Sequence, residues 1–126
     1  MKGLSFYQMS PVYVSDETFL LRIDLHISSV QELMSALHYG LWLPGCFGFN
    51  WNALFDCLLD LTWLPCAQVV IYHSSLPRLP DEELARYISV LSDAVNEQND
   101  GTRPRLSVVF PADFRAEVMQ SVGHSA

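Results

Sequence analysis

Basic side chains are scarce in this sequence. The 126 residues contain 7 Lys and Arg against 14 Asp and Glu, which gives a formal net charge of −7 at pH 7. Such a surface repels phosphate, so the composition argues against direct binding of nucleic acid or of an anionic membrane. It attracts cationic proteins instead, and we therefore expect a basic protein as the partner.

A long apolar segment is missing too. No stretch approaches the roughly 20 apolar residues of a membrane-spanning helix, and residues 1–9 hold no apolar run of secretory length. The three cysteines, Cys46, Cys57 and Cys66, cannot all pair within one chain, and the last two stand in apolar surroundings. A reducing compartment is the simplest setting for such thiols. We therefore expect a cytoplasmic protein without a membrane anchor.

The motifs of common catalytic centres are absent as well. The cysteines and histidines match no common zinc spacing, and there is neither a glycine-rich phosphate loop nor a Gly-x-Ser-x-Gly elbow. Cys57 falls on the apolar side of a predicted helix, where a thiol is inert. We expect no cofactor, no metal and no catalytic residue. An enzyme that uses Asp56 and Asp60 as acid and base is the remaining catalytic alternative.

Apolar residues, by contrast, are plentiful. Half of the residues are hydrophobic and 12% are aromatic, while 17% are charged, against about a quarter in ordinary domains. A chain of this size and composition can build a sizeable core, and no repeat or low-complexity tract interrupts it. We expect residues 1–126 to form a single domain with its core in residues 18–110.

The apolar pattern predicts strands that alternate with helices. Strands are predicted at residues 18–24, 67–72 and 105–110, and helices at about 30–41, 51–59 and 80–98. Strands separated by helices form parallel sheets with right-handed crossovers. The expected class is α/β, a two-layer fold in which a three-stranded parallel sheet packs against helices. Two weaker patterns allow an edge strand within residues 6–14 and a short helix within residues 113–122.

Polar side chains follow one face of the predicted helix at residues 51–59. Asn52, Asp56 and Asp60 recur at i, i+4 and i+8, which places them along one side. Phe49 and Phe55 flank this face, and aromatic groups beside a carboxylate are typical of protein-binding hot spots. The alternative interpretation is a solvated polar stripe without a function.

A second acidic pair, Asp93 and Glu97, falls on the outer face of the long predicted helix. If this helix packs beside the helix at residues 51–59, the two acidic edges converge; exposed acidic residues without a function are the alternative. The loop that precedes residue 50 contains Cys46, Phe47 and Gly48, and forms either a contact surface or a buried turn.

Residues 43–58 carry a resemblance to a known family, and they read LPGCFGFNWNALFDCL. The stretch resembles the signature of the barstar family, which runs Leu-Pro, two variable or aromatic residues, Gly-x-Asn-x-Asp-Ala-Leu, an aromatic residue and Asp-Cys-Leu. Residues 30–41 resemble the family's first helix, and residues 67–110 follow its order of strand, helix and strand. The likeness covers residues 18–110.

The resemblance implies a three-stranded barstar-like fold and an inhibitor that blocks a secreted ribonuclease inside the bacterium that produces it. In this family the signature helix and its preceding loop enter the basic active-site cleft of the nuclease, where aspartates replace RNA phosphates. Relatives also serve as immunity proteins for toxins. The resemblance therefore implies a non-enzymatic, cytoplasmic immunity protein, monomeric when free, that forms a 1:1 complex with a basic ribonuclease toxin.

Site residues follow from the same resemblance. The principal aspartate falls on Asp56, the aromatic residue before it on Phe55, and the acidic residue of the later helix on Asp93. The full set of expected partner-binding residues is Cys46, Phe47, Gly48, Phe49, Asn52, Phe55, Asp56, Asp60, Asp93 and Glu97.

Three positions depart from the family pattern. Asn52 stands where an aspartate is usual, Cys46 replaces a tyrosine or similar residue, and Phe49 replaces a polar one. One charge fewer and one aromatic more indicate a different nuclease target, with a less basic cleft. The alternative function is a non-catalytic interaction or self-association module that uses an apolar patch of Phe47, Phe49, Phe55 and Trp63.

Overall fold

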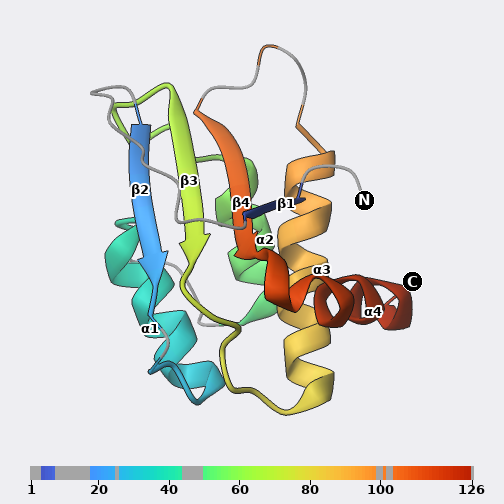
Figure 1. Ribbon diagram of the computed structural model, residues 1–126. Helices are drawn as coiled ribbons and strands as arrows, with labels where there is room; N and C mark the ends of the chain where they lie inside the picture. The colour runs from blue at the N-terminus through green and yellow to red at the C-terminus, as the bar shows by residue number, and fades with distance from the viewer. Residues whose placement is uncertain are drawn as a thin grey trace.

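The computed structural model describes residues 4–7, 18–24, 26–43, 50–98, 101 and 104–125, with side chains up to residue 121. The helices and strands run along the chain as follows (Figure 1): β1 (Leu4–Tyr7), β2 (Thr18–Ile23), α1 (Val30–Gly40), α2 (Trp51–Leu59), β3 (Gln68–His73), α3 (Asp81–Asn96), β4 (Arg105–Pro111), the short 3-10 helix η1 (Ala112–Phe114) and α4 (Arg115–Ser125).

All pairings in the sheet are parallel, and its strand order is β1-β4-β3-β2. The α/β class and the parallel sheet are confirmed, but the predicted number of three strands is wrong. The fourth strand is β1, which pairs with β4 in the register Leu4↔Val108. It overlaps the weak pattern at residues 6–14 only at its end, because four residues are too few to show an alternation of apolar and polar side chains.

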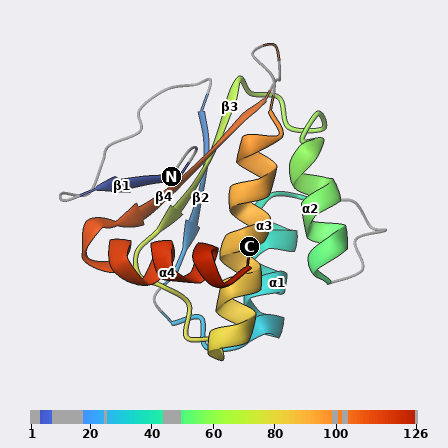
Figure 2. The same cartoon turned by 90° about the vertical axis from the view of Figure 1, so that its right-hand side faces the viewer.

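Helices cover one face of this sheet. Figure 2 shows α1, α2 and α3 on the same side of the strands, with α4 crossing in front of α3. The core lies between these layers, and its largest fully buried side chains include Ile23 of β2, Leu37 of α1, Leu54 of α2 and Leu91 of α3. This two-layer arrangement leaves the outer sides of the helices available to solvent and to partners.

The first helix begins where the sequence predicts. Ser29 caps α1, since its side-chain oxygen accepts a hydrogen bond from the backbone N–H of Glu32 at 3.1 Å. The Glu32 carboxylate in turn accepts from the hydroxyls of Ser28 and Ser29, and these hydrogen bonds lower the pKa of Glu32. The apolar stripe of α1 then buries Leu33 and Leu37 against the sheet.

The carboxyl end of β3 holds a buried polar pair that apolar patterning alone does not reveal. β3 extends one residue beyond the prediction to His73, which is fully buried and stacks on the Phe110 ring at 4.1 Å. Its Nδ1 lies 2.9 Å from the Val109 carbonyl and its Nε2 lies 2.6 Å from the Tyr87 hydroxyl. Because a carbonyl only accepts, Nδ1 carries the proton and the Tyr87 hydroxyl donates to Nε2. Burial lowers the pKa of His73 to about 4 and raises the pKa of Tyr87.

Candidate protein-binding site

Local chain chemistry fixes the start of α2. Asn50 is extended (φ −135°, ψ 166°), and its side-chain oxygen accepts a hydrogen bond from the Ala53 backbone N–H at 2.8 Å. Asn50 is thus the N-cap of α2. The helix therefore begins at Trp51, and the positions of all following side chains around α2 are set by this start.

The two sides of α2 differ sharply in exposure. Leu54 and Leu58 are buried in the core, whereas Asn52 and Asp56 are exposed on the other side. Phe55 is half-buried and packs against the core with part of its ring. Neither Asn52 nor Asp56 forms a side-chain hydrogen bond or an ion pair with another described residue. Within the described ranges, their polar groups therefore face solvent with no side-chain contact to be broken when a partner binds.

Asp60 behaves differently from Asp56. It is the C-cap of α2, and its backbone (φ −122°, ψ 81°) has left the helix. Its carboxylate accepts hydrogen bonds from the Thr62 hydroxyl at 2.7 Å and from the Thr62 backbone N–H at 3.3 Å. The spacing of i+8 does not continue the α2 face to Asp60, because the helix stops one residue earlier. Asp60 is an exposed carboxylate held in a turn.

A hydrogen bond ties α2 to α3. The Trp51 indole N–H donates to the Glu83 carboxylate at 3.1 Å, and the Trp51 ring lies 6.1 Å from the Tyr87 ring. Figure 2 shows the two helices side by side and running in the same direction. The sequence analysis did not predict this hydrogen bond. The features that could have indicated it are an indole directly after an N-cap and acidic residues in the first turn of α3.

The packing of α2 against α3 brings the two acidic edges to the same level. Asp56 lies five residues beyond Trp51, and Asp93 lies six residues beyond Tyr87, the contact partner of Trp51. At 1.5 Å per residue these steps are about 7.5 and 9 Å along the two helices. Asp93 is exposed, as is Glu97, the C-cap of α3, whereas Leu91 of the same helix is buried in the core.

The loop part of the predicted site lies outside the described residues. It comprises Cys46, Phe47, Gly48 and Phe49. Of the ten predicted partner-binding residues, the structure places the six on and after α2 and α3, namely Asn52, Phe55, Asp56, Asp60, Asp93 and Glu97.

This arrangement is suited to binding a cationic protein surface. Its exposed polar groups are chiefly carboxylates, which attract Lys and Arg side chains. Within the described ranges, no group of three or more His, Cys, Asp or Glu side chains is placed to hold a metal ion. Burial raises the pKa of the Cys66 thiol, so its thiolate is disfavoured. In the part of the chain that the structure describes, every helix is too short or too polar to cross a bilayer.

Comparison with known families identifies the class of this protein. The family model of barstar, described as the barnase inhibitor, matches residues 18–110. This match spans well over half of the sequence, and the chain belongs to the barstar family. The matched range contains β2, α1, α2, β3, α3 and nearly all of β4, and leaves β1 and α4 outside. No curated protein and no solved structure gives a significant match.

Membership in the barstar family indicates the general activity of the protein. Members of the barstar family are ribonuclease inhibitors of the barnase-inhibitor type and are not enzymes. The protein partner implied by the family is therefore a ribonuclease. The exposed acids of α2 and α3 lie inside the matched range.

Proposed function

We propose that the protein binds and blocks the active site of a cationic ribonuclease toxin with the exposed acidic face of α2 and the adjoining edge of α3. The observation that carries the proposal is Asp56, an exposed carboxylate without a described partner, on the signature helix of a ribonuclease-inhibitor family. A nuclease cleft that holds RNA phosphates presents cationic groups, and a carboxylate inserted there forms charge-assisted hydrogen bonds with them.

Electrostatics support the choice of partner. The net charge of −7 speeds association with a cationic nuclease, and the effect weakens as salt screens it. Asp56 and Asp93 provide the principal charges of the proposed contact, and Asn52, Phe55, Asp60 and Glu97 also take part in it. The loop residues Cys46 to Phe49 complete the contact. The inhibitor and the toxin form a 1:1 complex, and the inhibitor thereby acts as an immunity protein in a bacterial cytoplasm.

Affinity capture tests this function. Wild-type protein and the variant Asp56→Ala, Asp93→Ala are immobilised and exposed to a lysate of the source organism, and ribonuclease activity is assayed in the eluates after denaturation and refolding. The matched control is Asp24→Asn with Glu32→Gln, which removes two exposed charges elsewhere. We expect the wild type and the control to capture a basic nuclease and the double alanine variant to lose it. Equal capture by all three proteins would show that the interface lies elsewhere on the surface. The absence of a nuclease from all three eluates would contradict the proposed function.

The self-association alternative has little support from the described part of its patch. Phe55 and Trp63 are each half-buried against the core, and the Trp63 indole N–H donates to the Leu41 carbonyl at 2.9 Å. The other two aromatic residues of that patch lie outside the described residues. Light scattering at high concentration separates the two functions, because the inhibitor is expected to be monomeric when it is alone.

A further inference from the structure

A groove of about 870 Å³ lies along α3, between α4 and the start of α2. Its apolar lining includes Trp51, Leu84 and Val90, and carboxylates of Asp81 and Glu82 stand beside these groups. Part of the lining comes from α4, which follows the range matched by the barstar family. The groove is thus built by joining the family core to a segment that the family model does not include.

The charges that line this groove are mostly negative. Asp81 and Glu82 of α3 and Glu117 of α4 contribute three carboxylates, against the single guanidinium of Arg86. The apolar residues between them offer surface to the aliphatic stem of a lysine or arginine, whose charged end reaches the carboxylates. Trp51 adds an indole ring, the aromatic group that attracts cations best. The lining is therefore complementary to long basic side chains and repels anions.

We propose that this groove is a second docking surface, which binds a lysine- or arginine-containing segment of a protein partner. A second copy of this chain is a poor occupant, because each copy carries a net charge of −7 and like charges oppose its approach. The groove is distinct from the exposed face of α2 that carries Asp56, so the inference does not depend on the ribonuclease assignment. It gives α4 a role in recognition.

A peptide titration followed by NMR tests the groove directly. The ¹⁵N-labelled full chain is titrated with the acetylated, amidated peptide Gly-Arg-Gly-Arg-Gly and, separately, with the same peptide carrying Glu in place of Arg. We expect the arginine peptide to shift the Trp51 indole N–H signal together with the backbone amides of α4 and of the first half of α3. The glutamate peptide is expected to leave these signals in place.

Variants connect the signal to the carboxylates. Glu82→Gln with Glu117→Gln is expected to raise the dissociation constant of the arginine peptide about fivefold, because each exposed charge pair contributes modestly. A second variant, Gln120→Arg, places a cation at the exposed α4 side of the groove and is expected to weaken binding at least as much. Both variants change residues on helix surfaces. If one variant fails to fold, the other still tests the proposal.

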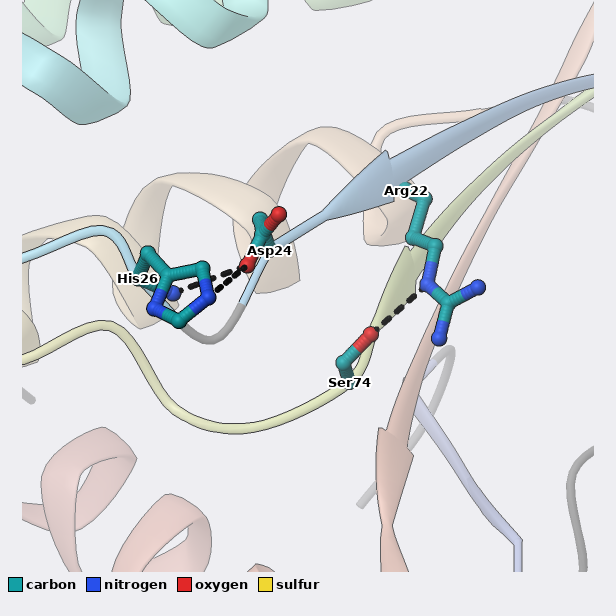
Figure 3. A network of polar contacts seen from close by, with 4 residues as sticks. All are labelled: Arg22, Asp24, His26 and Ser74. Atoms are coloured by element: carbon teal, nitrogen blue, oxygen red, sulfur yellow. Dashed lines mark hydrogen bonds and ion pairs between the residues drawn. The ribbon is translucent and has the colours of Figure 1, made fainter.

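The charge-matched control uses carboxylates that do not line the groove. Asp24, at the end of β2, forms its contacts with His26 (Figure 3), and Glu32 lies on α1. Asp24→Asn with Glu32→Gln is expected to bind the arginine peptide as the wild type does. Three results would overturn the proposal: equal binding of the glutamate peptide, shifts centred on Asp56 rather than on the groove, or equal weakening by the control and the groove variants.

Discussion

The carboxyl end of β3 and the outer face of α2 place polar groups in opposite environments. His73 is fully buried, and both of its ring nitrogens are hydrogen-bonded, one to the Val109 carbonyl and one to the Tyr87 hydroxyl. Asp56 is exposed, and its carboxylate has no described partner. A buried polar group must be paired or the fold loses stability, whereas an exposed carboxylate is already solvated by water.

This difference separates what stabilises the fold from what is available for recognition. Substitutions at the β3 end should change the free energy of unfolding and leave recognition unaffected. Substitutions on the outer face of α2 should change recognition and leave the free energy of unfolding nearly unaffected. The variants below test that separation, beginning with the largest expected effect.

The double variant Asp56→Ala, Asp93→Ala should abolish inhibition of the captured nuclease. Truncating charged contacts at an interface commonly costs 2–5 kcal/mol each, so we expect the affinity to fall by about 10³-fold or more. The free energy of unfolding should stay within about 1 kcal/mol of the wild type, because both sites are exposed. Inhibition titrations and urea unfolding measure the two quantities. Full inhibition by the variant would show that Asp56 and Asp93 are not part of the binding site.

The stability of the fold should fall as the pH drops from 6.5 to 4. Burial lowers the pKa of His73 from 6.5 to about 4, so between these values the unfolded chain binds a proton that the folded chain does not. Stability therefore rises with pH across this window and is unaffected by His73 above it. The shift corresponds to about 3 kcal/mol. Urea unfolding at a series of pH values measures the slope.

A glutamine at this position provides the control for the pH effect. His73→Gln has no group that titrates in the window, so the difference in stability between wild type and variant should vary with pH and level off above pH 6.5. A constant difference would show that His73 does not generate the slope. Binding of the nuclease above pH 7 should be the same in both proteins.

Removing the Tyr87 hydroxyl should destabilise the fold without changing recognition. Tyr87→Phe leaves Nε2 of His73 without its donor, and an unsatisfied buried acceptor costs about 2 kcal/mol. The matched change Tyr39→Phe, at an exposed side chain, should leave the free energy of unfolding unchanged. Thermal unfolding of both variants gives the comparison. If Tyr87→Phe weakened nuclease binding but not stability, the proposed separation would be wrong.

The cap of α2 connects the two regions. Asn50→Ala removes the acceptor for the Ala53 N–H and should cost about 1 kcal/mol of stability. It should also weaken nuclease binding, because Asn52 and Asp56 depend on an ordered first turn. Ser29→Ala removes the corresponding cap of α1 and should cost a similar amount without affecting binding. Equal effects of the two variants on binding would show that α2 needs no cap to recognise its partner.

Adding a charge to α2 should give the smallest effect. The first turn of α2 contains no acidic residue, and a carboxylate there interacts favourably with the helix dipole, so Asn52→Asp should stabilise the fold by about 0.5 kcal/mol. It should also speed association with a cationic nuclease at low salt and lose that gain at high salt. Stopped-flow association at two salt concentrations checks this. Slower association would indicate that the partner is not cationic at this contact.

Sequence periodicity predicted the elements that bury a regular apolar stripe. The boundaries of α1 and α2 follow from Ser29 and Asn50, since side-chain caps act within one turn and can be identified locally. The position of β1 was not predicted correctly, because its four residues are stabilised by pairing with β4, about a hundred residues further along the chain. Pairing over such a separation leaves no local signal.

The candidate site was predictable only in part, for the same reason. The exposure of Asn52 and Asp56 follows from helical spacing, and the structure shows both on the outer side of α2. The contact of Trp51 with Glu83 depends on how two helices pack, which spacing within either helix does not contain. Asp60 was assigned to the wrong geometry because helix ends are less regular than helix centres.

The pairing of β1 with β4 has a consequence for solubility. Without β1, the outer edge of β4 would present unpaired N–H and C=O groups along a strand that contains Val108, Val109 and Phe110. Such an apolar edge is a template for strands of other molecules and therefore for aggregation. A chain cut back to residues 18–110 would keep the matched region and lose this protection. The four residues of β1 therefore protect the edge of β4 from pairing with strands of other molecules.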